Sequence, residues 1–184
     1  MPLLAALLAL SVASVPLAGG RLGLLRELEL RRGWALLVAV AVQITILRLV
    51  PEAPPFLLGA AHLGSYGLAG VWLYSNRHVP GIALLAFGGA LNALAIAANG
   101  GVMPASPGAL ALAGMPATTG QFTNSAQVAD ARLGFLGDVF ALPTPLPLAS
   151  VFSVGDIIIA LGALYGLHVI CASRAARRLG VALG

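Results

Sequence analysis

Residues 80–99, PGIALLAFGGALNALAIAAN, form an apolar segment that contains no charged side chain. At about 1.5 Å per residue, a helix of this length is about 30 Å long, which matches the hydrocarbon core of a bilayer. Pro80 suits the first turn of a helix, and the pair Gly100–Gly101 suits a helix end. This stretch therefore predicts a transmembrane helix.

The rest of the chain repeats this pattern. Hydrophobic residues make up 59% of the sequence and charged residues 9%, whereas soluble domains usually contain about 25% charged residues. Too few charges remain to cover a water-facing surface. We therefore predict an all-α fold, a polytopic transmembrane helical bundle that forms a single integral membrane domain over residues 1–184. The expected spans, about five, are residues 2–18, 34–50, 56–74, 80–99 and 153–172, with an outer loop over residues 102–152.

The distribution of basic residues predicts the orientation. All of them are arginines, and most lie in short clusters between apolar segments. Such clusters indicate cytoplasmic loops, and they lack the interleaved aromatic residues of a basic nucleic-acid-binding face. No basic side chain precedes the first apolar segment, which favours a retained helix over a signal peptide. We expect a multi-pass protein of the cytoplasmic membrane with its N-terminus outside and its C-terminus in the cytoplasm.

Two further features concern packing and the outer loop. Gly89, Ala93, Ala97 and Gly101 recur every four residues, and Gly162 and Gly166 repeat that spacing, which predicts close packing of the last two spans. The outer loop is far longer than the usual connection of about 4–6 residues. It is predicted to contain short helices over residues 106–114 and 124–137, and to be the part of the protein that meets a partner.

Four polar residues near the outer ends of the spans are candidate binding residues, because polar groups within spans are costly. Each also has a structural interpretation. Arg48 can reach the interface and pair with Glu52, and Asn99 before two glycines suits a helix C-cap. Asn92 suits an interhelical hydrogen bond, and His62 suits a packed, hydrogen-bonded histidine.

Two carboxylates, Asp138 and Asp156, are the candidate catalytic residues. Three roles are open for Asp156: catalysis, an ion pair with Arg48, or a capping box with Ser153, because the pattern S-x-x-D precedes a long apolar run. Asp138 is either catalytic or part of a turn. Cys171 is the single cysteine and the three histidines lack ligand spacing, so neither a metal site nor a cofactor is predicted.

Three segments carry a resemblance to a known family: ALNALAIAANGGVMP (90–104), FLGDVFALPTPLP (135–147) and VFSVGDIIIALG (151–162). They are similar to a bacterial family of small integral membrane proteins known only as a domain of unknown function. The resemblance implies a bacterial membrane protein and supplies no activity.

A second, partial resemblance is to lipoprotein signal peptidase, a membrane-embedded aspartyl protease. Phe152, Ser153, Gly155 and Asp156 resemble the motif that opens the last helix of that family, with Ser for Asn and Gly for Ala. Residues 88–92 resemble the approach to its other aspartate, but residues 93–98 contain no acid. Paired acid–base chemistry needs two carboxylates, so this resemblance implies hydrolysis only if Asp138 or Asp130 folds back to Asp156.

The preferred interpretation is a non-enzymatic structural or accessory protein of the bilayer that binds a lipid or a membrane-protein partner through its outer face. Two alternatives stay open: a membrane-embedded aspartyl hydrolase, and a small transporter.

Overall fold

The computed structural model describes residues 2–117 and 123–181, and most of these residues are helical. The long helices are α1 (Pro2–Leu17), α2 (Gly33–Ile44), α3 (Pro55–Ser75), α4 (Ile82–Ala98) and α6 (Val154–Ile170). A π-helical turn, η2 (Thr45–Leu49), continues α2. Each helix, taking α2 with η2, begins and ends within two residues of a segment that the sequence predicts as a span.

By length and composition, α3 is the one helix in the described part of the chain that could cross a membrane by itself. It has 21 residues and a mean hydropathy of 1.3. The other four long helices are also apolar but shorter, at 10–17 residues. The prediction of an all-α helical fold is confirmed at the level of mostly helical architecture.

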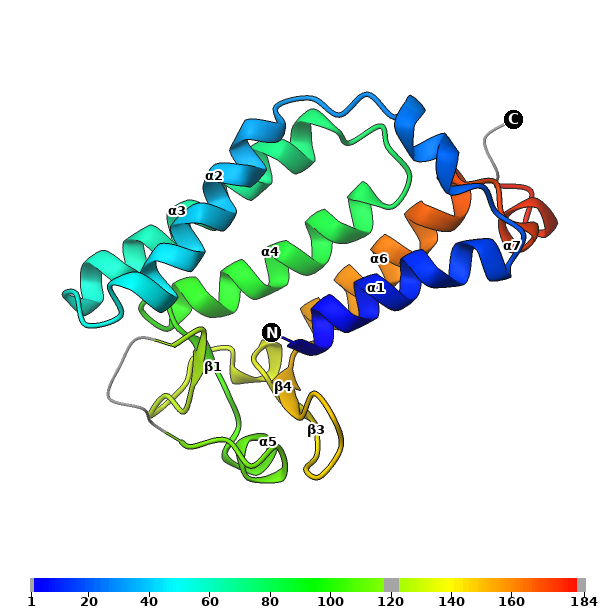
Figure 1. The fold of residues 1–184 in the computed structure, drawn as a ribbon. Helices are drawn as coiled ribbons and strands as arrows, with labels where there is room; N and C mark the ends of the chain where they lie inside the picture. The colour runs from blue at the N-terminus through cyan, green and yellow to red at the C-terminus, as the bar shows by residue number, and fades with distance from the viewer. Residues whose placement is uncertain (1, 118–122, 182–184) are drawn as a thin grey trace.

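The long helices follow one another in a curved layer (Figure 1). α2 and α3 form an antiparallel pair, α3 continues onto α4, α4 packs along α6, and α1 covers the far side of α6. Gln43 on α2 donates a hydrogen bond to Ser65 on α3 at 3.0 Å. α3 and α4 approach each other at the capped end and diverge toward the other end (Figure 1).

The predicted pairing of α4 with α6 is correct, and Gly162 and Gly166 lie at this interface as predicted. The stripe predicted on α4 is wrong. On the side of α4, the buried glycines are Gly81 and Gly88, which lie against the backbone of Gly162 and Gly155 respectively. Gly89 faces open space and Ala97 is exposed, so neither belongs to this interface. Gly81 also has φ +86°, a conformation that L side chains rarely adopt, at a point where its backbone meets Gly162 and Gly166.

The segment between α4 and α6 forms a cap over one end of the helices (Figure 1). α5 (Pro107–Leu112) begins at Ser106, whose hydroxyl accepts from Ala109 N at 3.1 Å, as the sequence predicts. Two small sheets follow. Strands β1 (Met103–Pro104) and β2 (Ser125–Ala126) are parallel, and β3 (Phe140–Leu142) and β4 (Ser150–Phe152) form an antiparallel hairpin.

The helix predicted over residues 124–137 is wrong. Ser125 and Ala126 extend instead and pair with β1, because backbone groups of β1 offer them partners. Asp130 and Leu133 then adopt positive φ values, which end any helical run. Only a 3₁₀ turn, η3 (Gly134–Leu136), remains in the described part of that range.

The two ends of the layer differ in charge. The capped end carries Arg48 and Arg132. The opposite end holds the 3₁₀ helix η1 (Leu22–Glu27), the turn after α3, and α7 (Arg174–Arg178). These segments are tied together, since Arg174 N donates to Ala18 O at 2.9 Å and Asn76 bonds both backbone groups of Arg31. This end carries the other arginines: Arg21, Arg26, Arg31, Arg32, Arg77, Arg174, Arg177 and Arg178.

Candidate functional site

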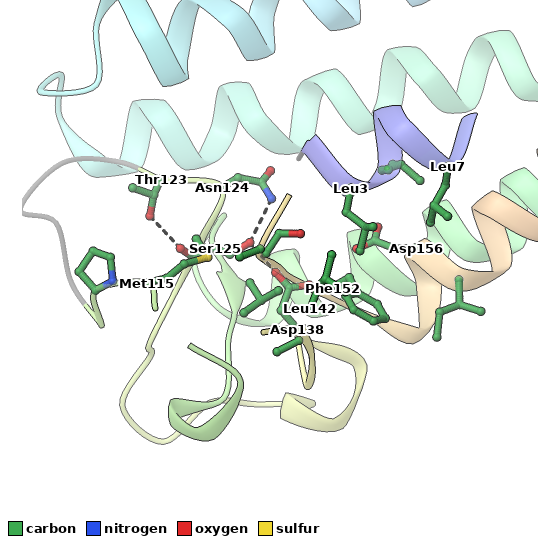
Figure 2. A pocket seen from close by; sticks show the side chains of 17 residues that line it. Leu3, Leu7, Met115, Thr123, Asn124, Ser125, Asp138, Leu142, Phe152 and Asp156 are labelled. Atoms are coloured by element: carbon green, nitrogen blue, oxygen red, sulfur yellow. Dashed lines mark hydrogen bonds between the residues drawn. The ribbon is translucent and has the colours of Figure 1, made fainter. Parts of the chain in front are cut away.

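A pocket of about 620 Å³ lies at the capped end, between the first turns of α1 and α6 and the cap (Figure 2). Leu3, Leu4 and Leu7 of α1 form one wall, and the hairpin β3–β4 with Met115 forms the rest of the apolar surface. The polar side chains of the lining include two carboxylates, Asp138 and Asp156, and the uncharged side chains of Thr123, Asn124, Ser125 and Ser150. An apolar cavity of this size with few polar groups is typical of small-molecule sites, which are about 300–1,000 Å³.

Asp138 is held in the cap by its backbone. Its N–H donates to Pro104 O at 2.8 Å and its carbonyl accepts from Ser106 N at 3.1 Å. This bridge seats the residue beside β1, and the side chain is only 3% exposed. One carboxylate oxygen, Oδ2, accepts a short hydrogen bond of 2.5 Å from Ser125 Oγ. The adjacent pairing of β1 with β2 brings Ser125 to this position.

The pKa of Asp138 is raised from its usual 3.8 to about 6, chiefly because burial disfavours the charged carboxylate. The Ser125 hydrogen bond opposes this shift, the negative charge of Asp156 adds to it, and the positive amino terminus opposes it. A carboxyl group with this pKa exchanges its proton close to neutral pH. It can therefore act as a hydrogen-bond donor or as an anion under mild conditions.

Asp156 caps α6, as the sequence pattern predicts. Its N–H donates to Ser153 Oγ at 3.0 Å, and its carboxylate oxygen Oδ2 accepts from Ser153 N at 3.1 Å. Both bonds of the capping box are therefore present. The negative charge also lies at the positive end of the helix dipole. The capping box fixes the carboxylate of Asp156 in the lining of the pocket.

Asn92 connects the capping box of α6 to α4. Its side-chain amide donates to Asp156 Oδ1 at 2.8 Å, while its carbonyl oxygen accepts from Ser153 Oγ at 2.8 Å. Gly155 makes room for this arrangement, because a Cβ at that position would collide with Asn92 Oδ1. The predicted interhelical hydrogen bond of Asn92 is confirmed, and it orients the carboxylate of Asp156.

The two aspartates thus line one pocket from different elements (Figure 2). Among the described residues no hydrogen bond joins them, and each has its own partners: Ser125 for Asp138, and Ser153 with Asn92 for Asp156. The arrangement places two carboxylates, each held by its own partners, in the lining of one pocket. It also gives the chain the second carboxylate that the sequence segment 93–98 lacks.

The other predicted binding residues lie outside the pocket lining. Arg48 is exposed in η2, and in the part of the chain that the structure describes it forms no ion pair with Asp156. His62 is fully buried on α3, and its Nδ1 donates to Gly101 O at 2.7 Å. Asn99 ends α4 as predicted, bonding Ala95 O at 2.7 Å, and it also holds the backbone of Arg132. His62 and Asn99 thus connect α3 and α4 to the backbone of the segment that follows α4.

Sequence reasoning missed Ser125 and the leucine wall of α1. A serine in a loop carries no local signal, and its role depends on β1 and β2 meeting across twenty residues of chain. Leu3, Leu4 and Leu7 look like any other apolar residues of a helix. The described residues contain no group of three or more His, Cys, Asp or Glu side chains placed to hold a metal ion.

Comparison with known proteins identifies the family and no function. A family model described as a family of unknown function, DUF5317, matches residues 27–167, and the chain belongs to this family. The matched range includes Asn92, Asp138 and Asp156. No curated protein and no solved structure matches the chain.

Proposed function

We propose that the protein is an integral membrane protein whose five long helices cross the cytoplasmic membrane of a bacterium with the capped end outside. The helix surfaces support this, because large apolar side chains such as Leu37, Phe56 and Phe87 are more than half exposed. In water such surfaces would be unstable, whereas in lipid they are the normal exterior.

The charge difference between the two ends supports the orientation. Eight arginines lie at the end with α7 and two at the capped end, and cytoplasmic loops carry the excess of basic residues. The four shorter helices require an adjustment. A 17-residue helix such as α4 is about 26 Å long, slightly less than a typical hydrocarbon core of about 30 Å. Local thinning of the bilayer and flanking residues accommodate that difference.

The function that the geometry supports best is binding of an amphiphilic, lipid-class ligand in the outer pocket. The single observation that carries this proposal is the composition of the cavity, which is apolar on most sides and has two carboxylates at one edge. α1 forms its leucine wall, so the cavity lies where a chain from the outer leaflet can enter. An amphiphile satisfies both kinds of surface at once.

A second candidate is an aspartyl hydrolase, and one observation favours it. Asp138 and Asp156 line the same pocket, which is the fold-back that the resemblance to lipoprotein signal peptidase requires. The raised pKa of Asp138 suits a general acid. One observation argues against a hydrolase: both carboxylate oxygens of Asp156 already accept hydrogen bonds, Oδ2 from Ser153 N and Oδ1 from Asn92. We therefore prefer binding without catalysis.

Photolabelling tests the binding proposal. The purified chain is irradiated with decanol that carries a diazirine in its alkyl chain, and the labelled peptides are identified by mass spectrometry. We expect saturable labelling of residues 3–7 and 141–157. Ala141→Trp places a large side chain in the cavity and should abolish this labelling, while labelling of the exposed face of α3 stays the same. Equal labelling of both proteins would contradict a ligand site in the pocket.

A further inference from the structure

The pocket is unbalanced in charge. The described residues that line it include two carboxylates, Asp138 and Asp156, and no lysine, arginine or histidine. The two arginines of the capped end, Arg48 and Arg132, are not among the lining residues. The positive amino terminus acts on Asp138, but one positive charge against two carboxylates leaves the site with an excess of negative charge. A ligand with a phosphate or carboxylate head would meet this like charge, which is unfavourable in an apolar cavity.

One acceptor in the pocket has no partner in the described part of the chain. The side chain of Asp138 is only 3% exposed, and Ser125 donates a hydrogen bond to its Oδ2 atom only. No described residue donates to Oδ1. Oδ1 is not one of the fully enclosed atoms that lack a partner, and Asp138 lines the pocket. Its oxygen can therefore accept a hydrogen bond from a donor that a ligand supplies. This observation is independent of the charge count.

We propose that the pocket recognises a cationic amphiphile, in which an alkyl ammonium head lies between Asp138 and Asp156 and the chain lies along Leu3 and Leu7. The inference rests on the proposed function and specifies its ligand. An ammonium group offers three donors, enough for Asp138 Oδ1 and for a remaining lone pair of Asp156. Hydrogen bonds between ionised partners are roughly twice as strong as neutral ones.

A metal ion fits this site less well than an amine. Hard cations need about six oxygen ligands, and the described residues gather no group of three candidate side chains. A bare metal ion also has no apolar surface that could pack against the leucine wall. In an alkylamine, the ammonium head can pair with the carboxylates and the alkyl chain can pack against the leucines.

Calorimetric titration of the purified full chain in a mild detergent tests the proposal. The ligands share one chain length and differ in the head: octylamine, octanol and octanoate, with ethylamine as the head without a chain. At pH 7.5 we expect octylamine to bind about tenfold or more tighter than octanol, because its hydrogen bonds to the carboxylates are charge-assisted. Octanoate and ethylamine should bind more weakly than octanol and octylamine respectively.

Charge variants identify the recognising groups. Asp138→Asn should reduce octylamine affinity to about that of octanol and leave octanol unchanged. Asp156→Asn is a second variant. It should also reduce the affinity for octylamine, and it keeps part of the capping box of α6. The matched control is Asp130→Asn, which removes one negative charge from the same loop at an exposed position outside the pocket and should alter nothing. Melting of each variant verifies its fold.

The outcomes separate this inference from the proposed function. If octylamine, octanol and octanoate bind equally in the wild type, the ligand is an amphiphile without a cationic head and the inference is wrong. If Asp138→Asn and Asp156→Asn both keep the preference for the amine, the carboxylates are not its basis and the inference is again wrong. If no ligand saturates, or Ala141→Trp binds all of them like the wild type, the proposed function itself fails.

Discussion

Among the described residues, Asp138 is a buried carboxyl group, with 3% of its surface exposed. An ionised carboxylate in an apolar wall is costly unless hydrogen bonds compensate it, and Ser125 supplies one. Because the folded state holds the proton more tightly than the unfolded chain does, this group makes folding less favourable as the pH rises from about 4 to about 6. Below that window both states are protonated, and above it both are ionised.

This reasoning gives a prediction for Asp138→Asn. The rise of the pKa of Asp138 from 3.8 to about 6 corresponds to roughly 3 kcal/mol of folding stability that the wild type loses between pH 4 and pH 6. The asparagine variant keeps a similar shape but has no carboxyl group that ionises. Its free energy of unfolding should therefore not fall between pH 4 and pH 6, and at pH 7 it should equal or exceed that of the wild type. Chemical denaturation of both proteins from pH 4 to pH 7.5 measures the difference. Parallel curves for the two proteins would show that Asp138 does not titrate in this window.

Residue roles that depend on local sequence could be predicted, and those that depend on distant pairing could not. The capping box at Ser153 and Asp156, the C-cap at Asn99 and the N-cap at Ser106 follow from patterns within four residues. Ser125 meets Asp138 only because two short strands pair and bring separate parts of the loop together. No spacing rule in the sequence expresses that contact.

At the level of the elements, the helices could be predicted but their faces could not. Apolar length and the prolines and glycines at the boundaries were sufficient for the bounds. A strict four-residue repeat, however, turns by about 40° per step around a helix with 3.6 residues per turn. The stripe from Gly89 to Gly101 therefore winds off any single face. The observed interface mixes steps of three and four residues, from Gly81 through Gly88 to Asn92.

Adjacent glycines of α4 provide a matched test of this interface. A Cβ added at Gly88 would meet the carbonyl oxygen of Gly155 at 2.5 Å, whereas one at Gly89 would meet nothing within 4 Å. Gly88→Ala should therefore destabilise the protein by about 1–3 kcal/mol. Gly89→Ala should be neutral or stabilising by up to about 1 kcal/mol, because alanine favours a helix. Thermal melting in detergent compares the two, and similar effects at both positions would argue against the α4–α6 contact.

For the molecule as a whole, the sequence predicts the helical scaffold and the charge asymmetry, while the cap and its pocket come from the structure alone. The cap is built from backbone pairings between β1 and β2 and between β3 and β4, and from side chains that hold loop backbone, such as Asn99 on Arg132. In the function proposed above, the cap encloses a binding site at the outer boundary of the bilayer. Under that proposal the cap and α7 lie on opposite sides of the membrane.

The most direct test is the accessibility of single cysteines on intact cells. Gln127 in the cap and Ala175 in α7 are both exposed, and each is replaced by cysteine in a chain whose buried native thiol is removed by Cys171→Ser. A membrane-impermeant maleimide should label position 127 on intact cells and position 175 only after the membrane is permeabilised. Labelling of position 175 but not 127 on intact cells would place the pocket in the cytoplasm, and labelling of both without permeabilisation would contradict a membrane-spanning bundle.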